Sequence, residues 1–349
     1  MMEFLTADWL GTPLWFWCAF GALVLLLTAF DLGFLHKEDR EMGVGESLRL
    51  SAFYVGVALA FGAWIWVARG ADFGIKYYTC FFLEKALSID NVFVISLIFT
   101  YFAIPAKYQY RALLWGIIAV IVLRGLMIAG GAALVAEAYW VLYIFAAFLV
   151  FTGLKMFFAG DHAPDIANNP AVKWISRHMR VTPQLHDQHF FVKVPDDKTG
   201  KLVTAATPLF LALVVINLAD LVFAVDSVPA IFAITTDTFI VYTSNIMAIL
   251  GLRALYFALA AMVHRFYYLK YALAAVLVFI GAKIFVADFV LGGDKFPPLL
   301  SLGVTAALIA GGVLYSLWKT RHGEDAAPHL PDRPAPQSTI ATTGSTHDA

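Results

Sequence analysis

The sequence predicts an all-α membrane protein that crosses the bilayer several times. Of its 349 residues, 61% are hydrophobic and only 14% are charged, and the mean hydropathy is +0.77. A typical soluble domain is about 45–50% apolar and about 25% charged, so the composition excludes that class. The apolar residues also form long runs of about 20 residues, the length that a transmembrane helix needs. Two cysteines exclude a disulfide framework and a Cys-rich metal site.

Nine runs are long and apolar enough for a membrane-spanning helix. No basic region precedes the first run, so we expect a retained helix and not a cleaved signal. Lysine and arginine gather in alternate loops, and this pattern places the N-terminus outside and the C-terminus in the cytoplasm. The predicted spans are 14–32, 48–67, 77–102, 112–135, 139–158, 207–234, 239–263, 271–291 and 299–318.

One internal segment, 159–206, is too polar to span. Asn169–Arg180 is compatible with a short helix, and the strands of a hairpin are expected on either side of its Pro-Asp-Asp-Lys-Thr-Gly turn. His186 and His189 are more typical of a surface than of a metal site. The tail is rich in Pro, Ser, Thr and Asp, and we expect disorder there. The resulting parts are 1–76, 77–158 (repeat 1), 159–206, 207–291 (repeat 2), 292–318 and 319–349.

An ordered set of three spans occurs twice: an acid helix, an arginine helix and a helix with Gly-x-Lys. Because three is odd, the second copy starts from the opposite side of the membrane. Inverted repeats of this kind build many secondary transporters, with the substrate site near mid-membrane. The matching pairs are Glu84-x5-Asp90 with Asp220-x5-Asp226, Arg124 with Arg253, and residues 143–155 with 271–283.

Each copy places two acids six residues apart in an apolar span, where one charge costs about 2.5–3.5 kcal/mol on insertion scales. On a regular helix the two side chains point about 120° apart, so they converge on one ligand only where the helix is broken. Pro229 lacks an N–H, and we expect a helix break that frees the carbonyl of Val225 beside Asp226. Irregular backbone at this depth is tolerated where it lines a cavity.

Oxygen-bearing side chains around these acids indicate a site for a hard cation. Carboxylates, amides and hydroxyls, without clustered sulfur or histidine, favour Mg²⁺, Ca²⁺ or Mn²⁺. The candidate metal ligands are Glu84, Asp90, Asn91, Asn217, Asp220, Asp226, Ser227 and Asn245.

Basic residues within the spans are candidate partners of the acids, namely Arg124, Arg253 and Lys85. Four acids against two arginines leave a net charge of 2 − 4 = −2, which suits one divalent cation if all six groups share a cavity. Alternatively, each arginine forms a buried ion pair that fixes the helices in register. Asp31, near the inner end of the first span, is either a helix-end acid or a gate.

Residues 84–94 (EKALSIDNVFV) and 220–233 (DLVFAVDSVPAIFA) resemble the two signatures of the bacterial TerC family, in its Alx-like branch within a LysE-type exporter superfamily. Residues 189–192 and 243–257 are also similar, and the resemblance covers roughly 31–318. It implies Mn²⁺ export across the inner membrane, linked to tellurite resistance or alkaline stress, along a path that includes Glu84, Asp90, Asp220 and Asp226. Asn217 stands where the family usually has a glutamate, which removes one anionic ligand.

We therefore expect a transporter and not an enzyme, with no permanently bound cofactor. The expected partners are Mn²⁺ or another divalent cation, protons as the counter-ion, and the lipid bilayer, but no nucleic acid. The alternative is a non-transporting membrane component of a metal or redox stress-resistance complex, docked through 159–206. An intramembrane aspartic protease would also pair two acids, but its Gly-x-Gly-Asp motif is absent at both.

Overall fold

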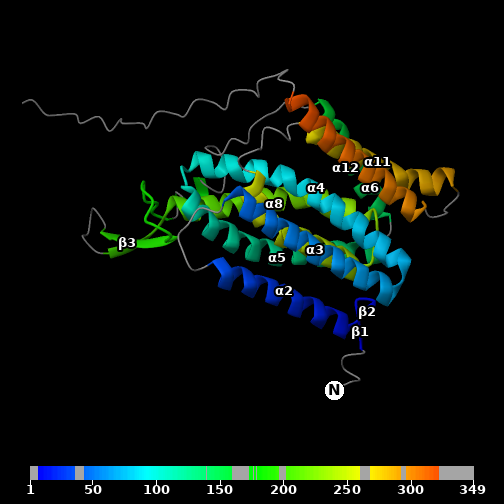
Figure 1. Cartoon of the computed structure of the whole chain (residues 1–349), viewed down its shortest axis with the longest axis horizontal. Helices are drawn as coiled ribbons and strands as arrows, with labels where there is room; N and C mark the ends of the chain where they lie inside the picture. The colour runs from blue at the N-terminus through cyan, green and yellow to red at the C-terminus, as the bar shows by residue number, and fades with distance from the viewer. Residues whose placement is uncertain are drawn as a thin grey trace, which may run out of the picture.

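The structure is a computed structural model that describes residues 7–35, 43–138, 140–158, 173–175, 177, 179–195, 202–259, 268–291 and 296–321. Within these ranges the protein is a bundle of long helices with two short antiparallel hairpins (Figure 1). The predicted all-α membrane class is confirmed.

The elements follow the predicted order along the chain. The strands are β1 (Asp8–Trp9), β2 (Thr12–Pro13), β3 (Phe191–Pro195) and β4 (Leu202–Ala206). The helices are α2 (Leu14–Leu35), α3 (Val44–Arg69), α4 (Ala71–Tyr101), α5 (Ala106–Glu137), α6 (Val141–Phe158), α8 (Pro208–Phe232), α9 (Thr238–Leu250), α10 (Leu252–Leu259), α11 (Leu269–Phe285) with a π-helical turn (Val286–Val290), and α12 (Pro298–Arg321).

Eight helical segments in the described part of the chain are long and apolar enough to cross a membrane, and they match eight of the nine predicted spans. The ninth is α4, whose 31 residues include Glu84, Lys85 and Asp90 and are therefore less apolar. Nevertheless, α4 packs against four other helices, α3, α8, α9 and α12, and Figure 1 shows it beside α3 and α8. Glu84 is buried and Lys85 contacts α9, so these two charges are placed among other helices.

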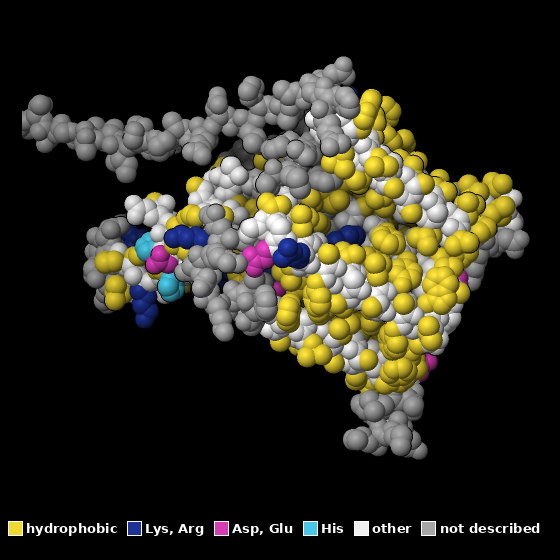
Figure 2. All heavy atoms as spheres, in the orientation of Figure 1, with side chains coloured by type: hydrophobic (Ala, Val, Ile, Leu, Met, Phe, Trp, Pro, Cys, Tyr) yellow, Lys and Arg dark blue, Asp and Glu magenta, His cyan; other side chains and the backbone are white. Residues whose placement is uncertain are grey.

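The surface separates into an apolar body and a polar end. Figure 2 shows hydrophobic side chains over most of the helical body on this face, while lysine, arginine, histidine and acidic side chains gather near β3. We call this the hairpin end, because the β3–β4 hairpin lies there and because α4 ends and α8 begins there. The opposite end of the bundle is the far end. This division is what a membrane-embedded bundle with one polar face requires.

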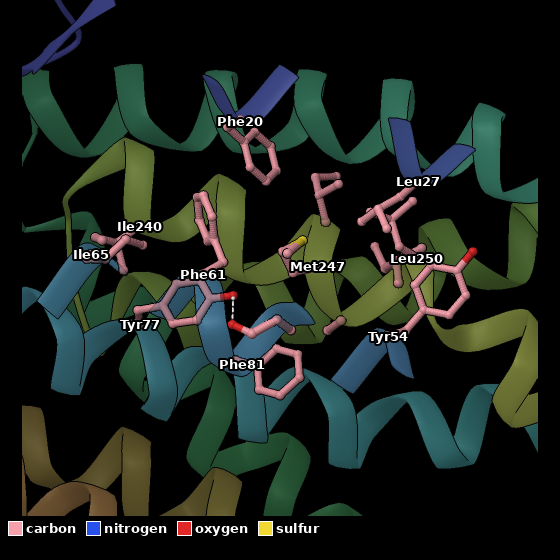
Figure 3. Packing of buried hydrophobic residues seen from close by; sticks show 14 of the residues in the cluster. Phe20, Leu27, Tyr54, Phe61, Ile65, Tyr77, Phe81, Ile240, Met247 and Leu250 are labelled. Atoms are coloured by element: carbon pink, nitrogen blue, oxygen red, sulfur yellow. Dashed lines mark hydrogen bonds between the residues drawn. The ribbon is translucent and has the colours of Figure 1, made fainter. Parts of the chain in front are cut away.

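A cluster of buried side chains joins α2, α3, α4 and α9 (Figure 3). Phe20 of α2, Phe61 of α3 and Tyr77 of α4 pack into it. The hydroxyl of Tyr77 also donates to the carbonyl of Ala58, at 3.1 Å. Since Tyr77 lies two helical turns before Glu84 on the same helix, the cluster holds the backbone that carries this acid.

Two glycines allow α6 and α11 to approach closely. A Cβ atom on Gly153 would lie 2.8 Å from the carbonyl oxygen of Ala274, and one on Gly281 would lie 2.6 Å from that of Ala146. The two contacts are reciprocal, because 281 − 153 and 274 − 146 are both 128, the shift that relates these spans in sequence. This is the packing expected of a pair of helices related by a two-fold axis.

The predicted helix break at Pro229 is wrong. α8 continues through Pro229 to Phe232. Proline removes only one helical hydrogen bond, the one to the carbonyl of Val225, and Pro229 itself is buried by neighbouring helices. Its own carbonyl still accepts a hydrogen bond from the N–H of Ala233, at 2.9 Å. The helix therefore ends one turn later.

The second arginine helix is the one that breaks, at Gly251 between α9 and α10. Lys85 of α4 lies against this break and donates its ammonium to the carbonyl of Ala248, at 3.2 Å. A cation is favoured there because the last carbonyls of a helix carry partial negative charge. Lys85 thus binds a helix end and not the acid beside it in sequence.

The predicted hairpin is present, with Phe191 paired to Ala206 and Pro195 to Leu202. The His186 ring bonds to the carbonyl of Gln184, at 3.1 Å, so this histidine contacts backbone in the structure. The predicted short helix at 169–180 is only partly described, with helical backbone at 173–175 and 177, and the tail after 321 lies outside the described residues.

Candidate functional site

Arg124, near the middle of α5, is the centre of a buried polar cluster. Its Nε and Nη2 donate to the two carboxylate oxygens of Asp220 on α8, at 3.0 and 3.1 Å. Its Nη1 donates to Glu84 on α4 and forms an ion pair with it. The exposed fractions of Glu84, Arg124 and Asp220 are 0%, 1% and 8%. One arginine therefore joins the first acid of both repeats in the interior of the bundle.

Neutral oxygen-bearing side chains complete the cluster. The same Nη1 atom lies 3.3 Å from the hydroxyl of Ser227 and 3.2 Å from the amide oxygen of Asn245 on α9. Asn91, one turn after Ser88 on α4, donates its amide to Asp220 at 3.3 Å. Five of the eight predicted metal ligands are thus brought together, but around a guanidinium group. They are Glu84, Asn91, Asp220, Ser227 and Asn245.

Two polar atoms in this cluster have no hydrogen-bond partner, although both are buried. They are Oε2 of Glu84 and Nδ2 of Asn245. An unsatisfied buried polar atom costs about 1–3 kcal/mol, and more when it is charged. If both acids are ionised, the cluster also has a net charge of 1 − 2 = −1. The site therefore has an unmet demand for positive charge or a proton.

A small cavity of about 20 Å³ borders the cluster on the side of the hairpin end. Asn91 and Asp220 form its polar wall, and Gly116, Val120 and Ile216 are among the apolar residues opposite. Such a volume holds about one water molecule. Asp220 consequently faces a space that admits water but not a larger ligand in this conformation.

The second acids of the two motifs are placed differently from the first. Asp226 faces α6, where Thr152 and Lys155 lie near it. Six residues correspond to about 9 Å along a helix, so Asp226 lies about that far from Asp220 toward the far end. The backbone of Asp90 lies a similar distance from Glu84 toward the hairpin end, but its side chain is outside the described part of the structure.

Arg253 does not join the cluster, contrary to the assumption that all six charged groups share one cavity. It forms an ion pair with Asp31 of α2, and its guanidinium lies 4.2 Å from the ring centroid of Tyr110. The hydroxyl of Tyr110 donates to the backbone carbonyl of Asp31, at 3.0 Å. Both Asp31 and Arg253 are buried. The two arginines therefore form separate ion pairs, and the acid that pairs with Arg253 comes from outside the repeats.

Asn217 lies one turn before Asp220 on α8 and remains outside the cluster. Its amide nitrogen donates to the carbonyl of Leu213 at 2.7 Å, while its amide oxygen is buried without a partner. Among the described residues, no three His, Cys, Asp or Glu side chains are grouped as a ready metal site. Glu84, Asp220 and Asp31 are held by arginine instead.

Comparison with known proteins identifies the family. A family model described as "Integral membrane protein TerC family" matches residues 69–324. The chain belongs to the TerC family. It is 47% identical to an "Uncharacterized membrane protein" of Rickettsia bellii over 301 residues, which are 86% of this chain and 96% of that protein. It is 41% identical to a "Putative membrane-bound redox modulator Alx" of Escherichia coli over 317 residues, 88% and 95% of the two chains.

A third relative, an "Uncharacterized membrane protein STKORF319" of Myxococcus xanthus, is 42% identical over 306 residues, 88% of this chain and 93% of that one. No solved structure gives a significant match. Together with the helical spans, the family assignment makes this TerC protein a multi-pass integral membrane protein.

Sequence reasoning missed two contacts at the site. The pairing of Asp31 with Arg253 joins residues 222 positions apart, and only the presence of an acid in an apolar span hinted at it. The contact of Lys85 with Ala248 depends on a helix end at Gly251, which lies within a continuous apolar run. Lys283 of α11 is also buried, and its ammonium donates to the hydroxyl of Ser301 at 3.2 Å.

Proposed function

We propose that this TerC protein transports a divalent metal cation, Mn²⁺ foremost, out of a bacterial cell across its inner membrane. Glu84 and Asp220 would be the central cation ligands, and Asn91, Ser227 and Asn245 would supply neutral oxygens or orient the acids. The observation that carries the proposal is the convergence of these oxygens, from both repeats, at the middle of the bundle. Oxygen donors without sulfur suit a hard cation.

The positions of the acids along the length of the bundle support a path for a cation and not an isolated site. Asp226 lies about 9 Å from the central pair toward the far end, and the backbone of Asp90 lies about 9 Å toward the hairpin end. A cation that left the centre in either direction would therefore meet another acid within two helical turns. Several weak sites in sequence permit passage where one strong site would trap the ion.

The reciprocal glycine contacts of α6 and α11 support an arrangement of two inverted repeats around the central site. Secondary transporters with inverted repeats commonly move one unit against the other around a midplane site. Protons are the natural counter-ion, because a departing cation leaves carboxylates that a proton can neutralise. Links to metal homeostasis, tellurite or alkaline stress would follow from such an activity.

The test is Mn²⁺ flux into liposomes that contain the purified full-length protein and an internal quenched dye. Glu84→Gln and Asp220→Asn should each abolish flux, and Asp90→Asn and Asp226→Asn should reduce it at least about tenfold, a barrier increase of about 1.4 kcal/mol. Asp72→Asn is the matched control, because Asp72 pairs with Lys76 on the exposed side of α4 at 2.5 Å. Flux that survives in the Glu84 and Asp220 variants would refute the proposal.

The second candidate is a non-transporting membrane component of a metal or redox stress complex. Relatives named as redox modulators favour it, as does the polar surface at the hairpin end (Figure 2). It predicts that deletion of 159–206 abolishes stress resistance in cells while Glu84→Gln does not. The opposite pattern supports transport.

A further inference from the structure

Arg124 occupies the point at which a cation would be coordinated. Its Nη1 atom lies within hydrogen-bonding reach of oxygens from Glu84, Ser227 and Asn245, and its other nitrogens hold both oxygens of Asp220. A hard divalent cation needs such oxygens within about 2.0–2.6 Å. The guanidinium and a metal ion therefore require the same oxygens and carry the same sign of charge, so they exclude each other.

We propose that Arg124 is a built-in competitor of the transported cation, and that the two alternate on Glu84 and Asp220. This inference rests on the proposed function for the identity of the site, and adds how the site is regulated. In the structure the arginine holds both acids. Cation binding releases the arginine from the acids, and cation release lets it return.

One buried acceptor in the cluster is left over by the hydrogen bonds that Arg124 donates. It is Oε2 of Glu84, which is buried without a partner, and one negative charge remains uncompensated if both acids are ionised. The cluster therefore offers a carboxylate oxygen that Arg124 does not use and that a different cation can bind.

The surroundings of Arg124 couple its release to helix movement. The adjacent cavity, whose wall includes Val120 one turn before Arg124, has a volume of about 20 Å³ and holds about one water. A guanidinium group cannot enter that volume. The arginine therefore cannot move into this cavity unless the helices around it shift, which links exchange of arginine for cation to a change of conformation.

The experiment is equilibrium binding of Mn²⁺ to the full-length protein in detergent, with free Mn²⁺ measured by electron paramagnetic resonance. Arg124→Gln should bind Mn²⁺ at least about tenfold more tightly than the wild type. Arg124→Lys keeps the charge but loses the planar fork, so its affinity should lie between the two. Arg253→Gln is the matched control, because Arg253 belongs to the separate pair with Asp31, and it should bind as the wild type does.

Unchanged or weaker Mn²⁺ binding in Arg124→Gln would overturn the proposal, since it would mean that the arginine only positions the acids. If Arg124→Gln fails to fold, Arg124→Lys decides: affinity at or below that of the wild type overturns it. Failure of the transport function is a separate result. If the wild-type protein shows no flux but the Arg124 variants bind Mn²⁺ more tightly, the transport proposal is refuted and the competition between Arg124 and the cation is supported.

Discussion

At the scale of single residues, two buried arginines satisfy buried acids at separate points of the bundle. Arg124 uses the full fork of its guanidinium, with two parallel hydrogen bonds to Asp220 and a third direction toward Glu84. Arg253 combines an ion pair to Asp31 with a position over the ring of Tyr110. Lysine offers neither the planar fork nor the stacking face, which explains arginine at both positions.

The Asp31–Arg253 pair gives a prediction for stability. Asp31→Asn leaves the buried Arg253 charge without its partner, and removing one member of a buried pair typically costs about 3–5 kcal/mol. We therefore expect a clear fall in the thermal unfolding temperature of the detergent-purified protein. Asp31→Asn combined with Arg253→Gln should recover part of the loss, because neither partner is then left charged.

The control for this prediction is Asp72→Asn. Asp72 is half exposed, and its pair with Lys76 is of the surface kind, worth about 0–1 kcal/mol. Equal unfolding temperatures for Asp31→Asn and Asp72→Asn would contradict the inference that the inner pair stabilises the bundle.

At the scale of elements, glycines allow the backbones of α6 and α11 to pack directly against each other. Gly281→Ala would place a methyl group 2.6 Å from the carbonyl oxygen of Ala146, so backbone must move apart. Overpacking of this kind costs about 1–3 kcal/mol, and we expect a lower unfolding temperature and slower Mn²⁺ flux. Gly130→Ala on α5 is the control, since a Cβ there meets nothing within 4 Å. An unfolding temperature for Gly281→Ala equal to that of Gly130→Ala would count against a rigid α6–α11 contact.

The limits of prediction from sequence also appear at this scale. The acid helix, arginine helix and Gly-x-Lys helix follow from apolar length and from matched spacing, and the helices are where these patterns place them. The break is not. Proline in α8 is the stronger local signal, yet α8 tolerates it near its end, whereas the chain breaks at Gly251. Tertiary contacts, including Lys85 on the carbonyl of Ala248, decide between these positions.

The candidate site was predictable as a set of residues but not as a geometry. Glu84, Asp220, Asn91, Ser227 and Asn245 stand out because polar groups are costly in apolar spans. Their convergence on Arg124 depends on how α4, α5, α8 and α9 pack, and the α4 and α8 acids are 136 positions apart. Long-range packing of this kind leaves no local pattern in a single sequence.

At the scale of the whole molecule, the distribution of charge predicts orientation in the membrane. The hairpin end carries the basic loops, so it should face the cytoplasm, and the far end should face outward. In a Cys18→Ser background, which removes the exposed native thiol, a membrane-impermeant maleimide should label Asp8→Cys in intact cells. It should label Lys193→Cys only after permeabilisation, although both positions are exposed. The reverse labelling pattern would invert the proposed direction of export.

The α3–α4 hairpin has a consequence for how the protein is made. α4 is less apolar than the other spans, but it is joined to the apolar α3 through Gly70 alone, and Tyr77 and Tyr78 bond to carbonyls of α3 at 3.1 and 2.8 Å. The two helices can therefore leave the ribosome and enter the bilayer as one unit. Arg124 is synthesised only 40 residues after Glu84, whereas Asp220 is synthesised 96 residues after Arg124. Arg124, which competes with the transported cation in the finished protein, would therefore act first during synthesis, by pairing with Glu84 and keeping this acid in the membrane.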